Sequence, residues 1–130
     1  MTDARIETVR LALDAISRRD LPALLDLLDP EIELRPLMSV WQRSYTGHEG
    51  IERWWSDVAQ LWDNFQVEAD DFRDVGGDAL FLRIHWHGIA KGSGNEVDGP
   101  LAGIARFAGD KVALLEIFID ERRALASLDR

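Results

Sequence analysis

The sequence predicts an α+β fold in which three main helices pack on a curved antiparallel sheet and enclose a cone-shaped cavity. Two observations lead to this prediction. Apolar residues recur at spacings of three and four in the first half of the chain, and they alternate with polar residues through most of the second half. Helices that precede a long sheet are typical of the α+β class. A curved sheet over helices leaves room for a small apolar ligand.

The helical half contains three amphipathic segments. A first helix is expected around residues 6–16, and a second begins at Leu21-Pro22, where proline suits a first turn. A strand is expected at 31–37 and a polar loop at 38–47. The clearest helix follows, and its apolar positions are Ile51, Trp54, Trp55, Val58, Leu61, Trp62 and Phe65. We expect its tryptophans to be core residues, and one of them can also form the floor of a ligand cavity.

Alternation with a period of two predicts four strands in the second half of the chain. Glycine-containing turns separate them at residues 76–77, 92–94 and 109–110, which indicates three successive hairpins. A short helix is expected near the end, over 121–128. The predicted strands span residues 66–75, 78–90, 95–107 and 111–120.

Length, charge and cysteine content limit the function. A chain of 130 residues is expected to form a single domain, and its net charge of −9 disfavours binding to nucleic acid or to an anionic membrane. The absence of cysteine excludes disulfides and thiolate chemistry. Neither a membrane span nor a signal peptide is expected, so we predict a cytoplasmic protein.

Several short motifs accompany this order of elements: 19–24 (RDLPAL), 28–31 (LDPE), 45–51 (YTGHEGI), 109–112 (GDKV) and 118–125 (FIDERRAL). On these motifs the chain resembles the nuclear-transport-factor-two-like superfamily, which has the fold of ketosteroid isomerases. Within it, the chain is most similar to the SnoaL-like polyketide cyclase group, over nearly its whole length. The superfamily contains isomerases, cyclases, epoxide hydrolases, dehydratases and non-catalytic binders, so the resemblance implies a single SnoaL-like domain over 1–130 but no particular reaction.

The last expected strand carries a candidate catalytic carboxylate. Glu116, Phe118 and Asp120 share one face of it, and the resemblance implies a catalytic aspartate at its end, the place of Asp120. An apolar cavity would raise the pKa of such a carboxyl and suit it to proton transfer, with Glu116 and Phe118 contacting the substrate. Alternatively, Asp120 caps the tail helix and this face is solvated or meets a second subunit.

His85 and His87 lie two apart on another expected strand and form the second candidate site. Both could reach one substrate and act as acid or base near neutral pH. They stand where the resemblance implies an arginine–aspartate pair in epoxide hydrolases, which weighs against that reaction. Alternatively, they lie on an exposed or dimeric sheet face. A metal triad with Glu116 or Asp120 is conceivable but not required by the spacing, so we predict neither metal nor cofactor.

Trp41 and Tyr45, in the loop before the long helix, are candidate substrate contacts together with Trp54. In this fold the loop can lie at the cavity mouth, where an aromatic ring can stack on a flat substrate. Tyr45 could instead anchor the turn at Gly47 and Gly50.

Two functions follow from these patterns. The first is cofactor-free acid–base chemistry (cyclisation, isomerisation, dehydration or hydration) on a small apolar carbonyl or cyclic compound. Asp120 would move the proton, and His85 or His87 would orient it or polarise an oxygen. The second is a non-catalytic module that binds an apolar molecule or a partner. The two differ in whether Asp120, His85 and His87 converge inside the cavity.

We predict a homodimer, because both faces of the sheet carry apolar residues and cannot both be solvated. The resemblance implies association through the outer face of the sheet. Sedimentation velocity at roughly tens of micromolar should show the dimer, and a monomer alone at this concentration would contradict the prediction.

Overall fold

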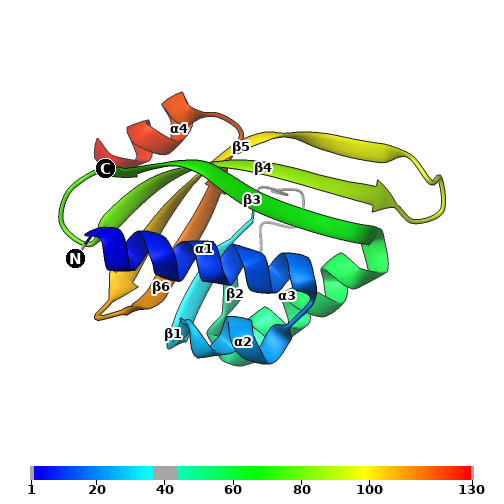
Figure 1. The fold of residues 1–130 in the computed structure, drawn as a ribbon, viewed down its shortest axis with the longest axis horizontal. Coiled ribbons are helices and arrows are strands. Elements are labelled where there is room, and N and C mark those ends of the chain that lie inside the picture. The colour runs from blue at the N-terminus through cyan, green and yellow to red at the C-terminus, as the bar shows by residue number, and fades with distance from the viewer. Residues whose placement is uncertain (1, 37–43, 130) are drawn as a thin grey trace.

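The computed structural model describes residues 2–36 and 44–129, and it has the expected α+β class. Two helices open the chain, and a third precedes the long strands (Figure 1). None of the helices in the described ranges is long and apolar enough to cross a membrane. In order, the elements are α1 (Thr2–Arg18), α2 (Leu21–Asp26), β1 (Leu28–Arg35), β2 (Tyr45–Thr46), α3 (Gly47–Leu61), β3 (Trp62–Asp74), β4 (Ala79–Ala90), β5 (Glu96–Ala108), β6 (Lys111–Phe118) and α4 (Glu121–Ala126), followed by a 3-10 turn, Ser127–Asp129.

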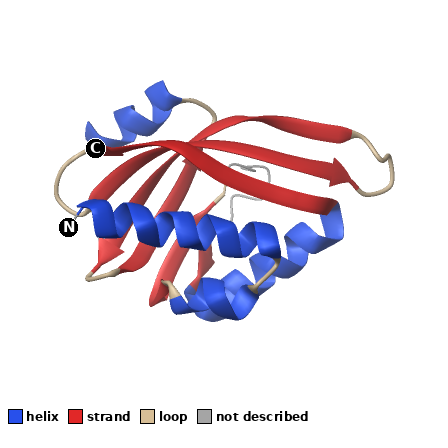
Figure 2. Cartoon of the chain, in the orientation of Figure 1, coloured by secondary structure: helices blue, strands red, loops and turns tan. Residues whose placement is uncertain are grey.

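The strands form one curved sheet in the order β2-β1-β6-β5-β4-β3 (Figure 2). β3 to β6 form the antiparallel meander predicted from the three glycine turns. β1 joins this meander beside β6 in a parallel direction, and the short β2 pairs with β1 at one edge. The sheet does not close, so β3 is its other edge.

Helices lie on both sides of this sheet: α1, α2 and α3 on one side and α4 on the other (Figure 1). We call these sides the inner and the outer face. Leu80, Leu82 and Ile84 of β4 point inward into the main core, where they join apolar residues of α1 and α2. The residue between the two leucines, Phe81, points outward and packs in a second cluster with Ala124 of α4. Alternation along β4 thus supplies both cores.

The predicted end of the long helix is wrong. α3 ends at Leu61, a residue that is 60% exposed, and Trp62 and Phe65 belong to β3. The strand's register shifts between Asp63 and Gln66, so an extra residue is accommodated there. This bulge puts Trp62 and Phe65, three apart, against the same ring of β4, which imitates helical spacing in the sequence.

Two further boundaries differ from the sequence prediction. α2 ends at Asp26, and the segment 28–30, expected to finish that helix, begins β1 instead. β6 ends at Phe118, so Asp120 lies beyond the last strand. In both places the residues at the boundary belong to the next element, either as its first residues or as its cap. The spacing of apolar residues does not show where one element ends and the next begins.

A serine joins α1 to the free edge of the sheet. The Ser17 hydroxyl donates to the carbonyl of Val67 at 2.9 Å, and the backbone N–H of Val67 donates back to the same hydroxyl at 3.0 Å. Both backbone groups of this edge residue are therefore satisfied by one side chain, which covers an otherwise open strand edge.

Replacing Ser17 by alanine should lower the free energy of unfolding by about 2 kcal/mol, because it leaves two half-buried backbone groups of Val67 without their partner. Urea denaturation of Ser17→Ala measures the loss. The matched control is Ser56→Ala at an exposed position of α3, which should change stability by no more than about 0.5 kcal/mol. Equal effects of the two substitutions would contradict this role of Ser17.

Candidate ligand-binding site

Five aromatic side chains meet where α3 runs into β3, and we call them the aromatic cluster. Trp54 contacts Trp55 and Phe65 edge to face, with ring centres 6.4 and 6.5 Å apart. Phe65 reaches Trp86 at 5.9 Å, and Trp86 contacts Trp62 at 5.0 Å with the rings at 83°. Such edge-to-face pairs stabilise beyond the apolar area they bury, by about 1 kcal/mol each.

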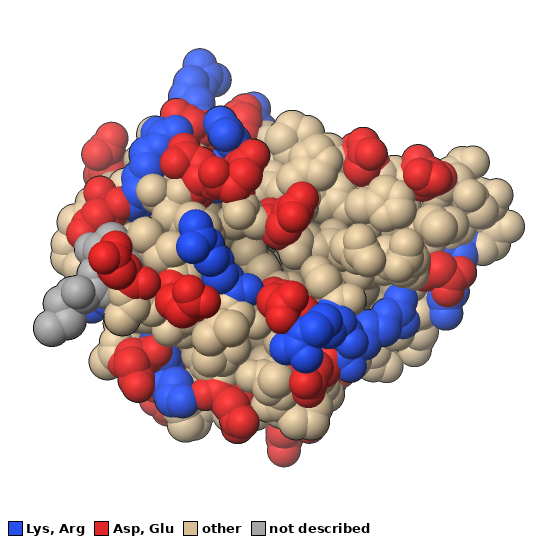
Figure 3. Space-filling model, in the orientation of Figure 1, with Lys and Arg blue, Asp and Glu red and all other residues tan. Residues whose placement is uncertain are grey.

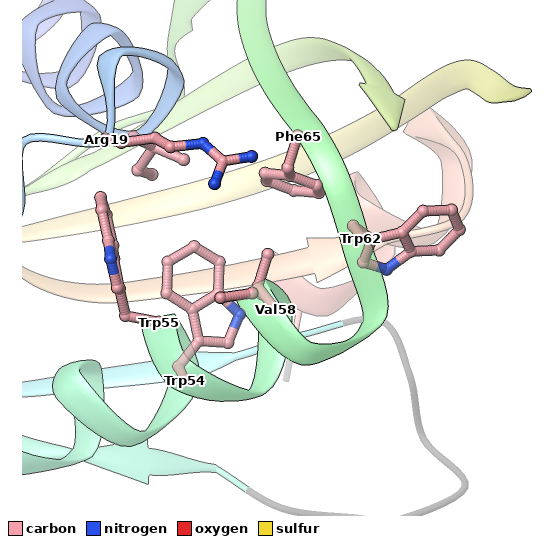
Figure 4. A pocket seen from close by; sticks show the side chains of 8 residues that line it. Arg19, Trp54, Trp55, Val58, Trp62 and Phe65 are labelled. Carbon is pink, nitrogen blue, oxygen red and sulfur yellow. The ribbon is translucent and has the colours of Figure 1, made fainter. Parts of the chain in front are cut away.

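The aromatic cluster borders a small apolar pocket between the end of α1, α3 and the start of β3 (Figure 4). The pocket holds about 30 Å³, which is room for little more than a water molecule, and it is not enclosed. None of the five rings is fully buried, but Trp54 and Trp55 pack against the main core, as expected for tryptophans of the long helix. The pocket is lined by Ile16, Arg19, Trp54, Trp55, Val58, Ala59, Trp62 and Phe65.

Gly88 on β4 allows Trp62 to lie close against the sheet. A Cβ atom at this position would stand 3.0 Å from the Trp62 ring and 3.4 Å from the Trp86 ring. The glycine therefore sets how deeply the indole of Trp62 sits, and with it one wall of the pocket.

Arg19 is the charged residue of the pocket lining, and its backbone is unusual. It follows α1 with φ of 61°, and the bonds from the N–H of Arg19 to the carbonyl of Ile16 and from Asp20 to Ala15 form a Schellman motif. This position normally holds glycine, because a side chain there costs about 1 kcal/mol. In Figure 4 the Arg19 side chain points over the pocket toward Phe65.

The acidic residues and the histidines all lie outside the buried core. Every Asp, Glu and His of the sequence lies within 2–36 and 44–129, and none of them is buried. On the face seen in Figure 3 acidic and basic side chains are intermixed. The pocket lining contains none of the acidic residues or histidines, so it offers no general base or acid of these types.

His85 and His87 lie on the outer face, opposite Trp86 and the aromatic cluster. His85 is exposed, and His87 is half-buried with its Nε2 3.3 Å from a carboxylate oxygen of Glu96. Both line an open groove of about 440 Å³ that passes around the β3 edge to α1, and its lining is mixed, with charged residues such as Arg10 and Asp14 beside apolar ones such as Leu13 and Trp86. The structure therefore brings the two histidines together, but in a different place from the apolar pocket.

Asp120 does not extend the sheet but caps α4. Its carboxylate accepts a hydrogen bond from the backbone N–H of Arg123 at 2.8 Å, and the residue is exposed. The expectation that it ends the closing strand inside a cavity is wrong, because the chain turns out of the sheet after Phe118. The geometry matches the capping alternative.

Glu116 and Phe118 also point outward from β6. Arg35 of β1 lies 3.4 Å from the Glu116 carboxylate and 2.7 Å from that of Glu33. The hydrogen bond from Arg35 lowers the pKa of the Glu33 carboxyl. Phe118 packs against the second core, beneath α4. Neither residue reaches the aromatic cluster, so the structure does not join them to the pocket.

Of the two described aromatic candidates near the long helix, Trp54 lies in the pocket and Tyr45 does not. Tyr45 is half-buried in β2, its hydroxyl donates to the Asp57 carboxylate at 2.6 Å, and its backbone approaches Gly50 closely. This is the expected structural alternative, an anchor for the turn into α3. Trp41 lies outside the described residues.

The sequence did not single out Arg19 or Phe65 as site residues. Phe65 was assigned to the apolar stripe of a helix, and Arg19 stood in a break between two helical patterns. The sequence did contain a feature that could have drawn attention to Arg19, because this arginine directly follows a predicted helix, at a position where glycine is usual. Across 2–36 and 44–129, no group of three or more acidic or histidine side chains is arranged to hold a metal ion.

Comparison with known proteins agrees with this architecture. A family model described as the SnoaL-like domain matches residues 9–115. The chain belongs to the SnoaL-like domain family. No curated protein matches the sequence of this SnoaL-like domain.

Solved structures share its fold at low sequence identity. An NTF2-like protein of unknown function from Burkholderia pseudomallei superposes with a TM-score of 0.80 at 19% identity, covering 95% of each chain. TerC, co-crystallised with polyporic acid, gives 0.80 at 14% identity over 98% of this chain and 99% of its own. A candidate SnoaL-like polyketide cyclase from Jannaschia sp. CCS1 gives 0.77 at 17% identity over 97% and 92%. At these identities the likeness shows the fold alone.

Replacing Asp120 by alanine should lower the free energy of unfolding by about 1 kcal/mol, because the backbone N–H of Arg123 loses its acceptor. Asp120→Asn keeps an acceptor oxygen and should leave stability nearly unchanged. Thermal or chemical denaturation of both variants compares them. If the Asp120 side chain does not stabilise α4 as a cap, the two variants should be equally stable.

Proposed function

We propose that this SnoaL-like domain binds a small, flat, apolar molecule in the pocket bordered by the aromatic cluster. The observation that carries the proposal is the incomplete burial of three tryptophans and a phenylalanine that line one pocket, Trp54, Trp55, Trp62 and Phe65. Clustered aromatic side chains that are only half-buried are typical of ligand sites, because a ligand that covers them removes their remaining apolar surface from water.

The chemistry of the lining favours binding over acid–base catalysis. The residues around the pocket are apolar apart from Arg19, and a guanidinium group stays protonated near neutral pH, so it cannot act as a general base. His85, His87 and Asp120 occupy the outer face and a helix cap, so they do not converge on the pocket. This is the arrangement expected for the non-catalytic alternative.

Ligand entry requires the pocket to widen. A volume of about 30 Å³ does not admit an aromatic ring. Trp55 and Arg19 both line the pocket and neither is buried, so their side chains can move to new rotamers while the core stays packed. The half-buried rings provide contact surface for a planar ligand, because an aromatic ligand can pack against them edge to face or by offset stacking.

The planar neutral compound 2-naphthamide should bind this domain and change its tryptophan fluorescence, since several indoles border the pocket. Val58→Phe should weaken binding about tenfold or more, because the larger side chain fills the opening from α3. Titration calorimetry measures the affinity, and circular dichroism checks that the variant folds.

The matched controls are His85→Gln and His87→Gln on the outer face, which should bind 2-naphthamide with wild-type affinity. Trp54→Leu provides a second pocket variant that keeps an apolar group in place. If the histidine variants lose binding and the two pocket variants retain it, the ligand site is the groove at the β3 edge and the proposal is wrong.

A further inference from the structure

We propose that the ligand of this pocket is an aromatic acid whose carboxylate is bound by Arg19. The inference rests on the proposed function, since it names the class of molecule that the same pocket takes. It follows from the placement of one cation beside the aromatic cluster.

The charge of Arg19 is not neutralised within the described part of the chain. Its neighbour Arg18 is held by Asp14 at 2.6 Å and by Asp20 at 3.3 Å. Among the ion pairs of residues 2–36 and 44–129, none joins Arg19 to a carboxylate, and the pocket lining contains no acidic side chain. A cation next to apolar rings and without a protein anion is suited to a ligand anion.

The backbone of Arg19 gives a second, independent reason. The turn that ends α1 requires a left-handed residue, and glycine would adopt it without steric cost. An arginine here is not explained by the turn. The left-handed conformation does, however, send the side chain over the pocket rather than along the helix (Figure 4). Strained residues at the border of a pocket are a recurrent feature of binding sites.

The shape of the guanidinium group agrees with this ligand class. Its planar fork can donate two parallel hydrogen bonds to one carboxylate, and the same plane can lie against an aromatic face. A ring between Trp54, Trp55 and Phe65 would carry a carboxylate substituent toward Arg19, which is exposed to solvent. The carboxylate would thus keep contact with water, which lowers the cost of its desolvation.

The test compares two probes of nearly equal shape, 2-naphthoate and the neutral 2-naphthamide. The wild-type domain should bind the carboxylate about five- to tenfold more tightly, the range for a solvent-accessible arginine–carboxylate pair. Arg19→Gln should remove this preference and leave the affinity for 2-naphthamide unchanged. Arg122→Gln, at an exposed position of α4, is the matched charge control and should keep the preference.

A third variant separates ligand binding from folding. Arg19→Gly should raise the melting temperature by a few degrees, because the left-handed position then carries glycine, and it should still lose the preference for 2-naphthoate. If Arg19 acts on stability alone, Arg19→Gln should change the melting temperature and should still bind 2-naphthoate more tightly than 2-naphthamide.

The outcomes distinguish this inference from the proposed function. Equal binding of both probes by the wild-type domain, or a preference that persists in Arg19→Gln, overturns the inference while the aromatic pocket remains a ligand site. If the wild-type domain binds neither probe, the proposed function fails and the inference fails with it.

Discussion

Alternation along β4 is the constraint on which the rest of the structure depends. In this strand the inward residues Leu80, Leu82 and Ile84 are buried under α1 and α2, and the next inward residue is Trp86. A strand cannot present one set of side chains without turning the intervening set to the other side. The same register that builds the core therefore places His85 and His87 on the outer face, and it leaves the inner face apolar.

Departures from regular geometry shape the pocket at the end of this apolar layer. The bulge in β3 turns Trp62 and Phe65 toward Trp86, and Gly88 lets the Trp62 ring come close to the sheet. Without the bulge, two residues three apart in a strand would point to opposite faces. The aromatic cluster thus results from a local irregularity in an otherwise regular sheet. Such irregularities cost pairing energy, and they are common beside functional sites.

The last turn of α1 connects the stability of the fold to the candidate site. Ser17 satisfies the backbone of Val67 at the sheet edge, and two residues later Arg19 turns over the pocket. Since the helix is anchored at this point, the backbone position of Arg19 relative to the aromatic rings is set by the fold. An arginine in a mobile loop would lose conformational entropy on meeting a ligand, whereas a partly ordered one loses less.

Periodicity and turn residues were sufficient to predict the class of the fold, the antiparallel meander and the first three helices, because these depend on local spacing. The end of α3 and the place of Trp62 depended on tertiary structure, because a bulge in a strand can imitate helical spacing. The place of Asp120 did so too, because a carboxylate that follows a strand can cap the next helix. The sequence also offered His85 and His87 as a site, but could not show which face of the sheet the helices cover. That choice was made by packing, because it requires residues far apart in the chain to meet around one core.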